Sequence, residues 1–343
     1  MSGKKILVTG GTGYIGSHTV VELINAGYKP VIVDNLSNST QQIINQIEKI
    51  TGIRPDFFNF DLCDEKMTLD FITAHPDIHG VIHFAAFKSV GESVQKPLKY
   101  YRNNFYSLIN LLEAFTGHKV NFVFSSSCTV YGEPDHLPVN EQAPVKEAES
   151  PYGNTKQVSE EILHEAAIVN DHLKVIALRY FNPVGAHSSA LIGELPIGVP
   201  QNLIPFITQA AIGKRGNINV YGNDYNTPDG TCIRDYIHVV DLAKAHVAAL
   251  RLMEDQDRTE RYDTYNIGTG RGSSVLEVIN AFETATGVKL KYSVAPRRAG
   301  DIEQIYGDVN KAEHELGWKA ERGLPEMMSS AWAWENYIDK NPL

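Results

Sequence analysis

The sequence predicts an α/β fold in which a doubly wound parallel sheet carries a smaller C-terminal substrate-binding domain. Three observations favour this fold class. Short apolar runs alternate with helical patterns through the first half of the chain. A glycine-rich segment separates the first of these runs from the helical pattern that follows it. Beyond residue 181 the periodicity gives way to a segment rich in Gly, Pro, Asn and Asp.

The apolar runs predict the strands of the sheet. Each run is continuous rather than alternating, which is typical of strands buried on both faces of a parallel sheet. The helical patterns between them predict right-handed crossovers. The runs are Ile6-Leu7-Val8, Val31-Ile32-Val33, Phe57-Phe58-Asn59-Phe60, Val81-Ile82-His83-Phe84, Phe122-Val123-Phe124 and Val175-Ile176-Ala177-Leu178. Ligands of such sheets bind at the carboxyl ends of the strands, which here hold Gly10, Asp34, Asp61, Ala85 and Ser125.

Two of the helices between the strands can be read in detail. One has Pro97 before it and Gly117 after it, and its apolar residues are spaced by four and three: Tyr101, Phe105, Leu108, Leu112 and Phe115. The other begins at Ser150 and Pro151, which suit the N-cap and first helical positions, so Tyr152 lies in its first turn. Its apolar positions continue with Val158, Ile162 and Ala166.

The boundary between the two domains is predicted near residue 181. The first domain then spans residues 1–180 and the second residues 181–343, because 343 residues exceed what one hydrophobic core usually supports. Residues 182–235 have the irregular texture of a substrate-binding lobe. The chain is expected to rejoin the first domain over about residues 236–268, where a helical pattern is followed by a strand-like run.

Composition and charge exclude several classes of partner. The formal net charge of −10 argues against a nucleic acid or an anionic membrane surface, since both require clustered Lys and Arg. A small-molecule substrate fits better. Cys63, Cys128 and Cys232 are too few and too far apart for a disulfide framework or a Cys-rich metal site, which predicts a reducing, cytoplasmic location. His75 and His79 have a metal-ligand spacing, but Pro76 lies between them, and we expect no metal site.

The glycine-rich segment predicts a dinucleotide site. Gly10, Gly13 and Gly16 permit a tight turn, close approach of phosphate to the backbone, and packing of the helix on the sheet. A simple strand-to-helix turn is the alternative for such a motif standing alone. Asp34 follows the second strand, where a carboxylate accepts hydrogen bonds from a ribose and repels a 2′-phosphate, which favours NAD over NADP. Asp61 either holds the adenine edge or only begins a turn.

Tyr152 and Lys156 predict the chemical site. They are spaced i, i+4, so phenol and ammonium share one helix face. A phenol has a pKa of about 10, and acting as a base near neutrality requires a shift of roughly 3 units, or about 4 kcal/mol. The ammonium beside it supplies part of this stabilisation, unless the pair is a chance spacing. Ser127, at the end of a predicted strand, either presents its hydroxyl to the substrate or only caps that strand.

Taken together, these motifs resemble the UDP-glucose 4-epimerase (UDP-galactose 4-epimerase) family of the extended short-chain dehydrogenase/reductase superfamily. The resemblance covers essentially the whole chain. The glycine-rich segment is common to the superfamily, whereas the other segments are together specific to the epimerases. The segments are Val8 to His18, Val90 to Pro97, Ser125 to Gly132, Arg179 to His187, Gly222 to Tyr225 and Arg234 to Val239.

The resemblance implies a Rossmann NAD-binding domain over residues 1–180 and a UDP-sugar-binding domain over residues 181–343. It implies that Tyr152 is the base, Lys156 its electrostatic partner and Ser127 the hydroxyl that relays or shares the proton. The residues implied to bind NAD are Gly10, Gly13, Tyr14, Ile15, Gly16, Asp34, Asn35, Asn38, Asp61, Leu62, Phe84, Lys88, Asn103, Tyr152 and Lys156. Those implied to bind the UDP-sugar are Ser127, Asn182, Asn202, Leu203, Tyr221, Arg234, Tyr236, Arg298 and Asp301.

The reaction implied by the resemblance interconverts UDP-galactose and UDP-glucose. The base takes the proton of the sugar 4-hydroxyl, C4 gives hydride to tightly bound NAD, and hydride returns to the other face of a 4-keto sugar. Binding energy from the UDP part supports the reaction at a loosely held hexose. Arg234 and Arg298 suit a diphosphate. The alternative for Arg298, with Arg297, is a solvated basic turn.

Two departures from the epimerase pattern stand out. Asn154 and Thr155 follow Tyr152-Gly153 where Lys and Ser are common, which removes a second ammonium and is expected to have little effect. Ile305 stands where some epimerases have Tyr, a position at which bulk limits the room for a 2-N-acetyl group. The sequence therefore suggests the hypothesis that UDP-N-acetylglucosamine is also accepted.

Two alternative functions share some of these motifs. A nucleotide-sugar 4,6-dehydratase shares the Tyr and Lys, but enzymes of that kind have an acidic pair after the central Ser or Thr. In this chain Cys128 and Thr129 follow Ser127, so the acid and base for the elimination are missing. An NAD-sensing protein without turnover would not need Tyr152, Lys156 and Ser127 together.

The helices that carry the Tyr101 stripe and Tyr152 are predicted to pair across a two-fold axis in a homodimer, although core packing would also explain their apolar residues.

Overall fold

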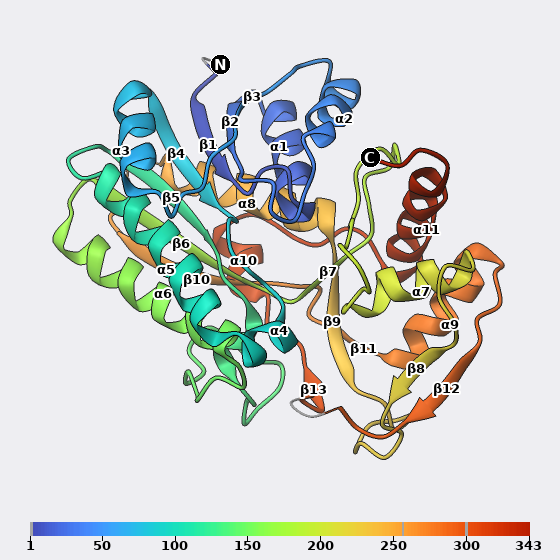
Figure 1. Cartoon of the computed structure of the whole chain (residues 1–343). Coiled ribbons are helices and arrows are strands. Elements are labelled where there is room, and N and C mark those ends of the chain that lie inside the picture. The colour runs from blue at the N-terminus through green and yellow to red at the C-terminus, as the bar shows by residue number, and fades with distance from the viewer. Residues whose placement is uncertain (1–2, 256, 299–300) are drawn as a thin grey trace.

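The computed structural model describes residues 3–255, 257–298 and 301–343. Its centre is a seven-stranded sheet in the order β10-β6-β5-β4-β1-β2-β3, in which every pair of neighbouring strands is parallel (Figure 1). The strand order reverses direction at β1, next to β4, which is where open sheets of this kind bind ligands. The strands are β1 (Lys5–Thr9), β2 (Lys29–Val33), β3 (Asp56–Phe58), β4 (Ile78–His83), β5 (Val120–Ser125), β6 (Leu173–Tyr180) and β10 (Tyr262–Ile267).

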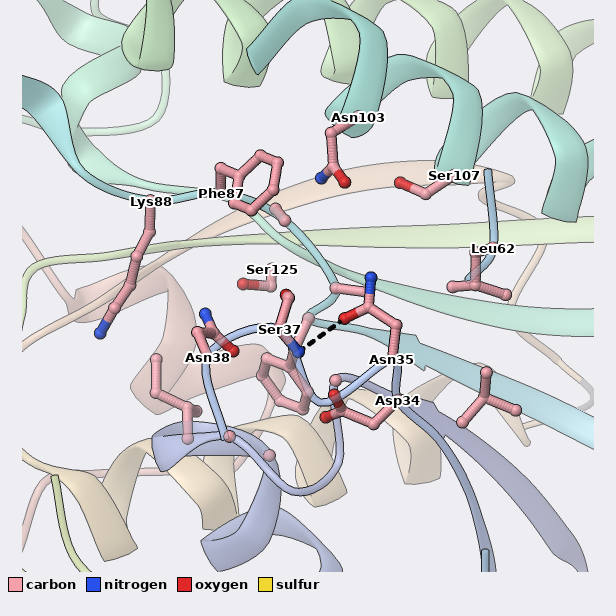
Figure 2. Close-up of a pocket in the computed structure, with 18 of the residues that line it drawn as sticks. Asp34, Asn35, Ser37, Asn38, Leu62, Phe87, Lys88, Asn103, Ser107 and Ser125 are labelled. Atoms are coloured by element: carbon pink, nitrogen blue, oxygen red, sulfur yellow. Dashed lines mark hydrogen bonds between the residues drawn. The ribbon is translucent and has the colours of Figure 1, made fainter. Parts of the chain in front are cut away.

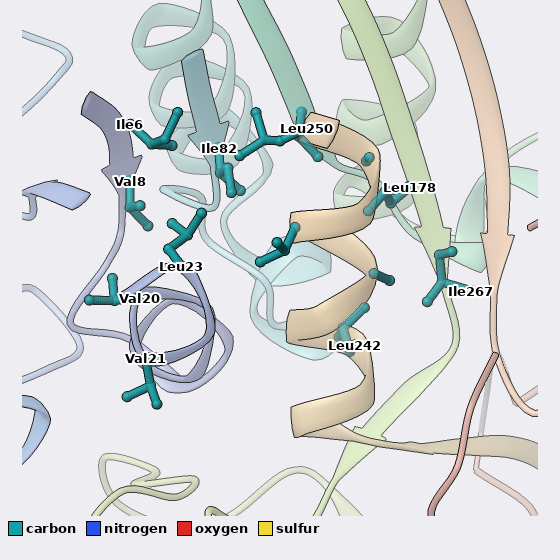
Figure 3. Close-up of a cluster of buried hydrophobic side chains, with 14 of the residues drawn as sticks. Ile6, Val8, Val20, Val21, Leu23, Ile82, Leu178, Leu242, Leu250 and Ile267 are labelled. Carbon is teal, nitrogen blue, oxygen red and sulfur yellow. The ribbon is translucent and has the colours of Figure 1, made fainter. Parts of the chain in front are cut away.

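Helices cover both faces of this sheet, which confirms the predicted doubly wound α/β class. On one face α1, α2 and α8 contribute to one buried cluster with the strands, and Figure 3 shows Leu23 of α1 and Leu242 of α8 within it. On the other face α3, α5 and α6 pack against a second cluster. The helices around the sheet are α1 (Tyr14–Asn25), α2 (Gln42–Thr51), α3 (Glu65–Ala74), α4 (Val90–Gln95), α5 (Pro97–Ala114), α6 (Pro151–Val169) and α8 (Val239–Met253).

The predicted start of α6 is confirmed at atomic detail. Ser150 is its N-cap, with its hydroxyl accepting a hydrogen bond from the Gly153 amide at 3.1 Å, and Pro151 is the first helical residue. An N-cap side chain of this kind satisfies an amide that the helix itself leaves free. Tyr152 therefore lies in the first turn, close to the end of β5.

The apolar stripe predicted for α5 is only partly buried in the core. Leu108 and Phe115 are buried as expected, but Tyr101, Phe105 and Leu112 are only half-buried. The buried face is instead shared with polar side chains: Tyr100, Asn104, Ser107, Leu108, Leu111 and Ala114. Asn104 accepts a hydrogen bond from the Phe87 amide at 2.9 Å and donates one to Thr155 Oγ1 at 3.0 Å, which is why an amide side chain is buried there.

The apolar positions predicted for α6 show the same offset. Val158, Ile162 and Ala166 are half-buried rather than buried. The fully buried face carries Tyr152, Thr155, Lys156, Ser159, Glu160, Leu163 and Ala167. A helix that buries polar and charged groups cannot be oriented from its apolar residues alone.

The C-terminal part builds two small sheets and a helical layer. One sheet has the order β11-β9-β13 with β7 beside β9, and the other pairs β8 with β12. Its elements are β7 (Asn182–Val184), α7 (Leu203–Ala211), β8 (Ile218–Tyr221), β9 (Ile233–His238), β11 (Gly272–Ser274), α9 (Val275–Thr286), β12 (Tyr292–Ala295), β13 (Gln304–Ile305), α10 (Asn310–Glu315) and α11 (Leu324–Lys340). Residues 182–235, predicted as irregular, thus contain one helix and two complete strands, with a third, β9, beginning at Ile233.

The chain returns to the central sheet after entering the C-terminal part. The helix α8 packs beside α1, and β10 pairs with β6 in parallel from Tyr262↔Val175 to Ile267↔Tyr180 (Figure 1). Because of this return, we propose the domain division predicted from the sequence, in which residues 1–180 and the returning segment form one domain. Among the described residues, no helix is long and apolar enough to cross a membrane.

Candidate active site

The residues predicted to bind the cofactor line a single pocket at the carboxyl ends of the sheet. Figure 2 shows Asp34 and Asn35, from the loop after β2, and Asn103, from α5, around this pocket. The predicted residues that line it are Gly10, Gly13, Tyr14, Ile15, Gly16, Asp34, Asn35, Asn38, Asp61, Leu62, Phe84, Lys88, Asn103, Tyr152 and Lys156. The strand-end residues Ala85 and Ser125 line it as well.

The glycine turn between β1 and α1 forms one end of the pocket. Gly10 has φ +69°, a left-handed conformation that favours glycine. A Cβ on Gly16 would lie 2.2 Å from the Gly10 carbonyl oxygen, so no side chain fits there. The first turn of α1 contains no acidic residue. Its free amides and positive end therefore suit a pyrophosphate.

Asp34 directly follows β2 and lines the pocket, at the position predicted for a ribose contact. Its carboxylate accepts hydrogen bonds from the Thr12 amide at 3.1 Å, the Leu36 amide at 2.9 Å and the Ser39 hydroxyl at 3.3 Å. A carboxylate has about four acceptor positions, so one further donor, such as a ribose hydroxyl, fits. Asp61 accepts from Asn35 Nδ2 at 3.1 Å and from the Cys63 amide at 2.9 Å. Asp61 thus begins a turn and also lines the pocket, and its contact with the adenine edge stays a prediction.

The three predicted catalytic residues come from two neighbouring elements. Tyr152 and Lys156 stand on α6, while Ser127 follows β5 and caps the short 3₁₀ helix η1 (Cys128–Tyr131), accepting a hydrogen bond from the Thr129 amide at 3.2 Å. The Lys156 Nζ lies 6.0 Å from the centroid of the Tyr152 ring and donates to the Ser125 carbonyl at 2.6 Å. All three side chains are buried.

Burial dominates the acid–base properties of these groups. It raises the pKa of Tyr152 well above its ordinary value, while a hydrogen bond from Ser127 acts in the opposite direction. Burial lowers the pKa of Lys156 to about 8, against the nearby charge of Glu160, which raises it. The protein alone therefore keeps Tyr152 as a neutral phenol, and further positive charge in the pocket is needed to make it a base.

The structure adds pocket residues that sequence reasoning missed. Tyr180, at the end of β6, shares a 2.6 Å hydrogen bond with the Ser125 hydroxyl. Tyr180 lies within the segment Arg179 to His187, which resembles the epimerases, but that resemblance assigns it no role. Ser37, Phe87 and Ser107 also line the pocket, and no pattern in the sequence singles them out. The remaining additions are Val33, Phe60 and Ala86.

Some of the predicted UDP-sugar residues meet along β9. Asn182 of β7 is the register partner of Tyr236, and Ile305 of β13 is the register partner of Arg234. Arg234 donates to the Ile233 carbonyl at 2.8 Å. The charges of Arg234 and Asp301 both act on the pKa of the Tyr236 hydroxyl, which burial raises to about 12.

The other predicted UDP-sugar residues form two separate groups. Arg298 lies over the Tyr221 ring, 5.7 Å from its centroid, and donates to both oxygens of Asp301, the closest contact being 2.7 Å. Asn202 caps α7 and donates to Glu194 Oε1 at 2.8 Å. Leu203 packs beside the cluster that contains Tyr236.

No metal site forms among the described residues; His75 ends α3, and His79 lies in β4 and not in a loop.

Comparison with known proteins decides the family. The family model described as GDP-mannose 4,6 dehydratase matches residues 7–331. The UDP-glucose 4-epimerase of Yersinia pestis is 48% identical over 338 residues, covering 98% of each chain, and that of Bacillus subtilis is 50% identical over 332 residues, covering 96% of each. The chain belongs to the UDP-glucose 4-epimerase family. At this identity over nearly full length, the dehydratase alternative is not favoured.

Solved epimerase structures share the fold closely. The UDP-glucose 4-epimerase of Stenotrophomonas maltophila, with bound NAD and formylated UDP-arabinopyranose, has a TM-score of 0.94 at 48% identity and covers 98% of this chain and 99% of its own. That of Bifidobacterium longum, in complex with NAD+ and UDP, has a TM-score of 0.92 at 47% identity, with the same coverage. The resemblance read from the motifs is thereby confirmed for the whole epimerase chain.

Proposed function

We propose that this chain interconverts UDP-galactose and UDP-glucose with tightly bound NAD. The observation that carries the proposal is the juxtaposition of the Tyr152, Lys156 and Ser127 triad with a glycine-cradled dinucleotide pocket in a member of the epimerase family. Asp34 at the ribose position favours NAD over NADP, because a 2′-phosphate would meet a carboxylate there. NAD supplies a reversible hydride acceptor for the sugar C4, which yields a 4-keto sugar.

The protein groups supply the proton transfer. Tyr152 takes the proton from the 4-hydroxyl and later returns it, while Ser127, hydrogen-bonded to it, shares that proton. Lys156 keeps its ammonium on the same helix face, where it stabilises phenolate character. Because burial raises the Tyr152 pKa in the protein alone, we infer that base strength develops when the positively charged, oxidised cofactor lies in the pocket.

The UDP part is held mainly by the C-terminal segments. Arg234 and Arg298 provide positive charge for a diphosphate, and Asn182, Tyr221 and Asp301 provide polar groups for the nucleoside. Arg298 and Asp301 form an ion pair at 2.7 Å, which orients the two side chains toward each other. Anchoring of this remote part leaves the hexose free to present either face of C4.

The experiment that tests this function uses UDP-galactose as substrate. The purified protein is incubated without added NAD, and UDP-glucose is followed. Conversion to an equilibrium mixture supports the epimerase and shows that cofactor is retained through purification. Failure to convert, even with NAD supplied, contradicts the proposal, and release of a 4-keto-6-deoxy sugar would point to dehydratase chemistry instead.

A wider substrate range is favoured by one position. Ile305 is buried beside Cys128 and Phe181, and it is the register partner of Arg234 in the UDP-binding strand β9. A branched aliphatic side chain occupies less depth than a tyrosine ring. We infer that the hexose subsite has room for a 2-N-acetyl group and that UDP-N-acetylglucosamine is a second substrate.

The protein is also proposed to act as a cytoplasmic homodimer. The helices α5 and α6 pack side by side, and both carry half-buried apolar residues. Leu112, Ile162 and Ala166 pack partly against the core, whereas Tyr101, Phe105 and Val158 belong to no core cluster. A two-fold pairing of these helices would cover those residues. The three cysteines are free thiols in the structure, which suits a reducing compartment.

A further inference from the structure

A buried ion pair joins α6 to β6 beneath the catalytic residues. Arg179 donates from Nε to Glu160 Oε1 at 3.0 Å and from Nη2 to Glu160 Oε2 at 2.6 Å. The side chains are only 7% and 8% exposed. Two parallel hydrogen bonds between a guanidinium and a carboxylate fix the relative orientation of both groups.

The same carboxylate holds the segment that carries the catalytic serine. Ser126 Oγ donates to Glu160 Oε1 at 2.5 Å, and Ser126 is fully buried. Its two neighbours both take part in the site, since the Ser125 carbonyl accepts from Lys156 and Ser127 faces Tyr152. Glu160 therefore constrains the backbone between these two contacts.

Glu160 also stands one helical turn after Lys156, on the same buried face of α6. Its negative charge raises the pKa of the Lys156 ammonium, which burial lowers to about 8. Among the described residues, the titratable groups near Lys156 come from three elements: His83 of β4, Tyr152 and Glu160 of α6, and Tyr180 of β6. His83 is neutral, with its pKa lowered to about 3, so Glu160 is the anionic member of this set.

The guanidinium is satisfied on its other side as well. Arg179 Nη1 donates to Tyr131 Oη at 3.2 Å, and Tyr131 donates to Asn266 Oδ1 at 2.7 Å. The network thus continues into β10. A buried ion pair is by itself poor evidence of stabilisation, because apolar side chains of equal volume often serve as well or better. This pair, however, joins α6, β6 and the segment after β5, and all three carry residues of the site. Its position therefore indicates a role in the reaction.

We propose that Glu160, held by Arg179, is a positioning residue for the epimerase reaction: through Ser126 it fixes the segment that bears Ser127, and through its charge it keeps Lys156 an ammonium. The inference rests on the proposed function in that Ser127 and Lys156 act on the substrate. Both side chains are buried, engaged with each other, and outside the cofactor pocket, so they act through Ser126 and Lys156.

The test is the Glu160→Gln variant, studied as holoenzyme over a range of pH. Without the carboxylate the Lys156 pKa falls further, so the ammonium is lost at a lower pH. The alkaline limb of the kcat profile is expected to move to lower pH, with kcat reduced at least ~10-fold and KM for UDP-galactose nearly unchanged. Ser126→Ala, which removes only the hydrogen bond, is expected to lower kcat without moving that limb.

Glu335→Gln is the matched control. Glu335 is also a buried, ion-paired carboxylate, with Lys214 Nζ at 2.9 Å, but it lies on α11 away from the site. It is expected to keep the wild-type pH profile even where it lowers thermal stability. An unmoved alkaline limb in Glu160→Gln, with a kcat loss no larger than in Glu335→Gln at equal NAD content, would overturn the proposal.

Two further measurements cover the case in which the variant does not fold and follow the Lys156 pKa directly. If Glu160→Gln fails to fold, the double variant Glu160→Gln/Arg179→Gln removes both charges. The alkaline limb is then expected to move in the same direction but by less, because loss of the guanidinium offsets part of the loss of the carboxylate, and an unmoved limb is contrary. The Lys156 pKa is also followed by NMR in ¹³C-lysine-labelled protein, with Lys156→Met for assignment. A wild type inactive on UDP-galactose contradicts the proposed function, whereas an unchanged Lys156 pKa in Glu160→Gln contradicts this inference.

Discussion

At the scale of single residues, the main question is how a buried phenol becomes a base. Tyr152 is enclosed by protein, and burial raises its pKa, so the side chain is a neutral donor in the protein alone. The Ser127 hydrogen bond lowers the Tyr152 pKa in the protein alone, while the Lys156 ammonium donates to the Ser125 carbonyl. The chemistry therefore depends on a small set of groups that surround one oxygen atom.

Removing that oxygen gives the first prediction. Tyr152→Phe is expected to lower kcat by about 10² to 10⁴, the usual contribution of a positioned acid–base group, because no other described side chain replaces the phenol. NAD content is expected to stay at the wild-type level. Tyr106→Phe, an exposed tyrosine on α5, is the control and should retain full activity. A Tyr152→Phe variant within tenfold of wild type would contradict the assignment.

The second prediction concerns the width of the hexose subsite. Ile305→Tyr places a ring where a buried aliphatic side chain now packs against Cys128 and Phe181. The ratio of kcat/KM for UDP-N-acetylglucosamine to that for UDP-galactose is expected to fall at least ~10-fold, since the ring would take up room for the acetyl group and such a misfit costs about 1–3 kcal/mol in substrate discrimination. Ile305→Leu conserves volume and should leave the ratio nearly unchanged. Wild-type protein that converts UDP-galactose but not the N-acetyl sugar would disprove the hypothesis.

At the scale of secondary-structure elements, the turn from β1 to α1 is the most constrained part of the cofactor pocket. Gly10 N donates to the Val33 carbonyl at 2.8 Å, and Gly13 N donates to the Gly10 carbonyl at 3.0 Å. The turn is thereby fixed to β2 and to itself. The helix α1 starts at Tyr14, directly after this turn, so its free amides face the pocket.

The third prediction tests this turn. In Gly16→Ala the new Cβ would lie 2.2 Å from the Gly10 carbonyl oxygen, so the turn or the helix must shift. We expect loss of most of the bound NAD, measured in the supernatant after acid precipitation, and a parallel loss of activity. Gly91→Ala on α4 is the control, because its Cβ meets nothing within 4 Å. Wild-type NAD content in Gly16→Ala would contradict the role of this turn.

The sequence identified elements and motifs more reliably than helix faces. The glycine spacing, Asp34 and the Tyr152–Lys156 pair could be read because each serves a local geometry, a turn, a strand end or one helix face. The inner face of α5 could not, since Asn104 is buried there through hydrogen bonds to Phe87 and Thr155 that lie elsewhere in the chain. Apolar patterning is blind to a polar residue whose partners come from a distant segment.

At the scale of the whole molecule, the UDP-sugar residues come from segments far apart in the chain. β9 brings Asn182 beside Tyr236 and Ile305 beside Arg234, pairings that no local pattern encodes. The family resemblance supplied these residues, whereas their individual chemistry did not. Arg179 begins one of the segments that carry the resemblance, but the resemblance gives it no role, and its partner Glu160 lies outside those segments. Only the buried contact between α6 and β6 brings the two together.

The last prediction concerns assembly. If α5 and α6 pair with a second copy across a two-fold axis, Phe105→Glu buries two carboxylates per dimer without partners, each costing about 3 kcal/mol or more. We expect the wild type to sediment as a dimer and Phe105→Glu as a folded monomer in analytical ultracentrifugation. Ile53→Glu is the control, since Ile53 is exposed beyond the end of α2, on another part of the surface, and should leave the dimer intact. A monomeric wild type, or a Phe105→Glu variant that stays dimeric, would show that the half-buried stripe on α5 serves the core alone.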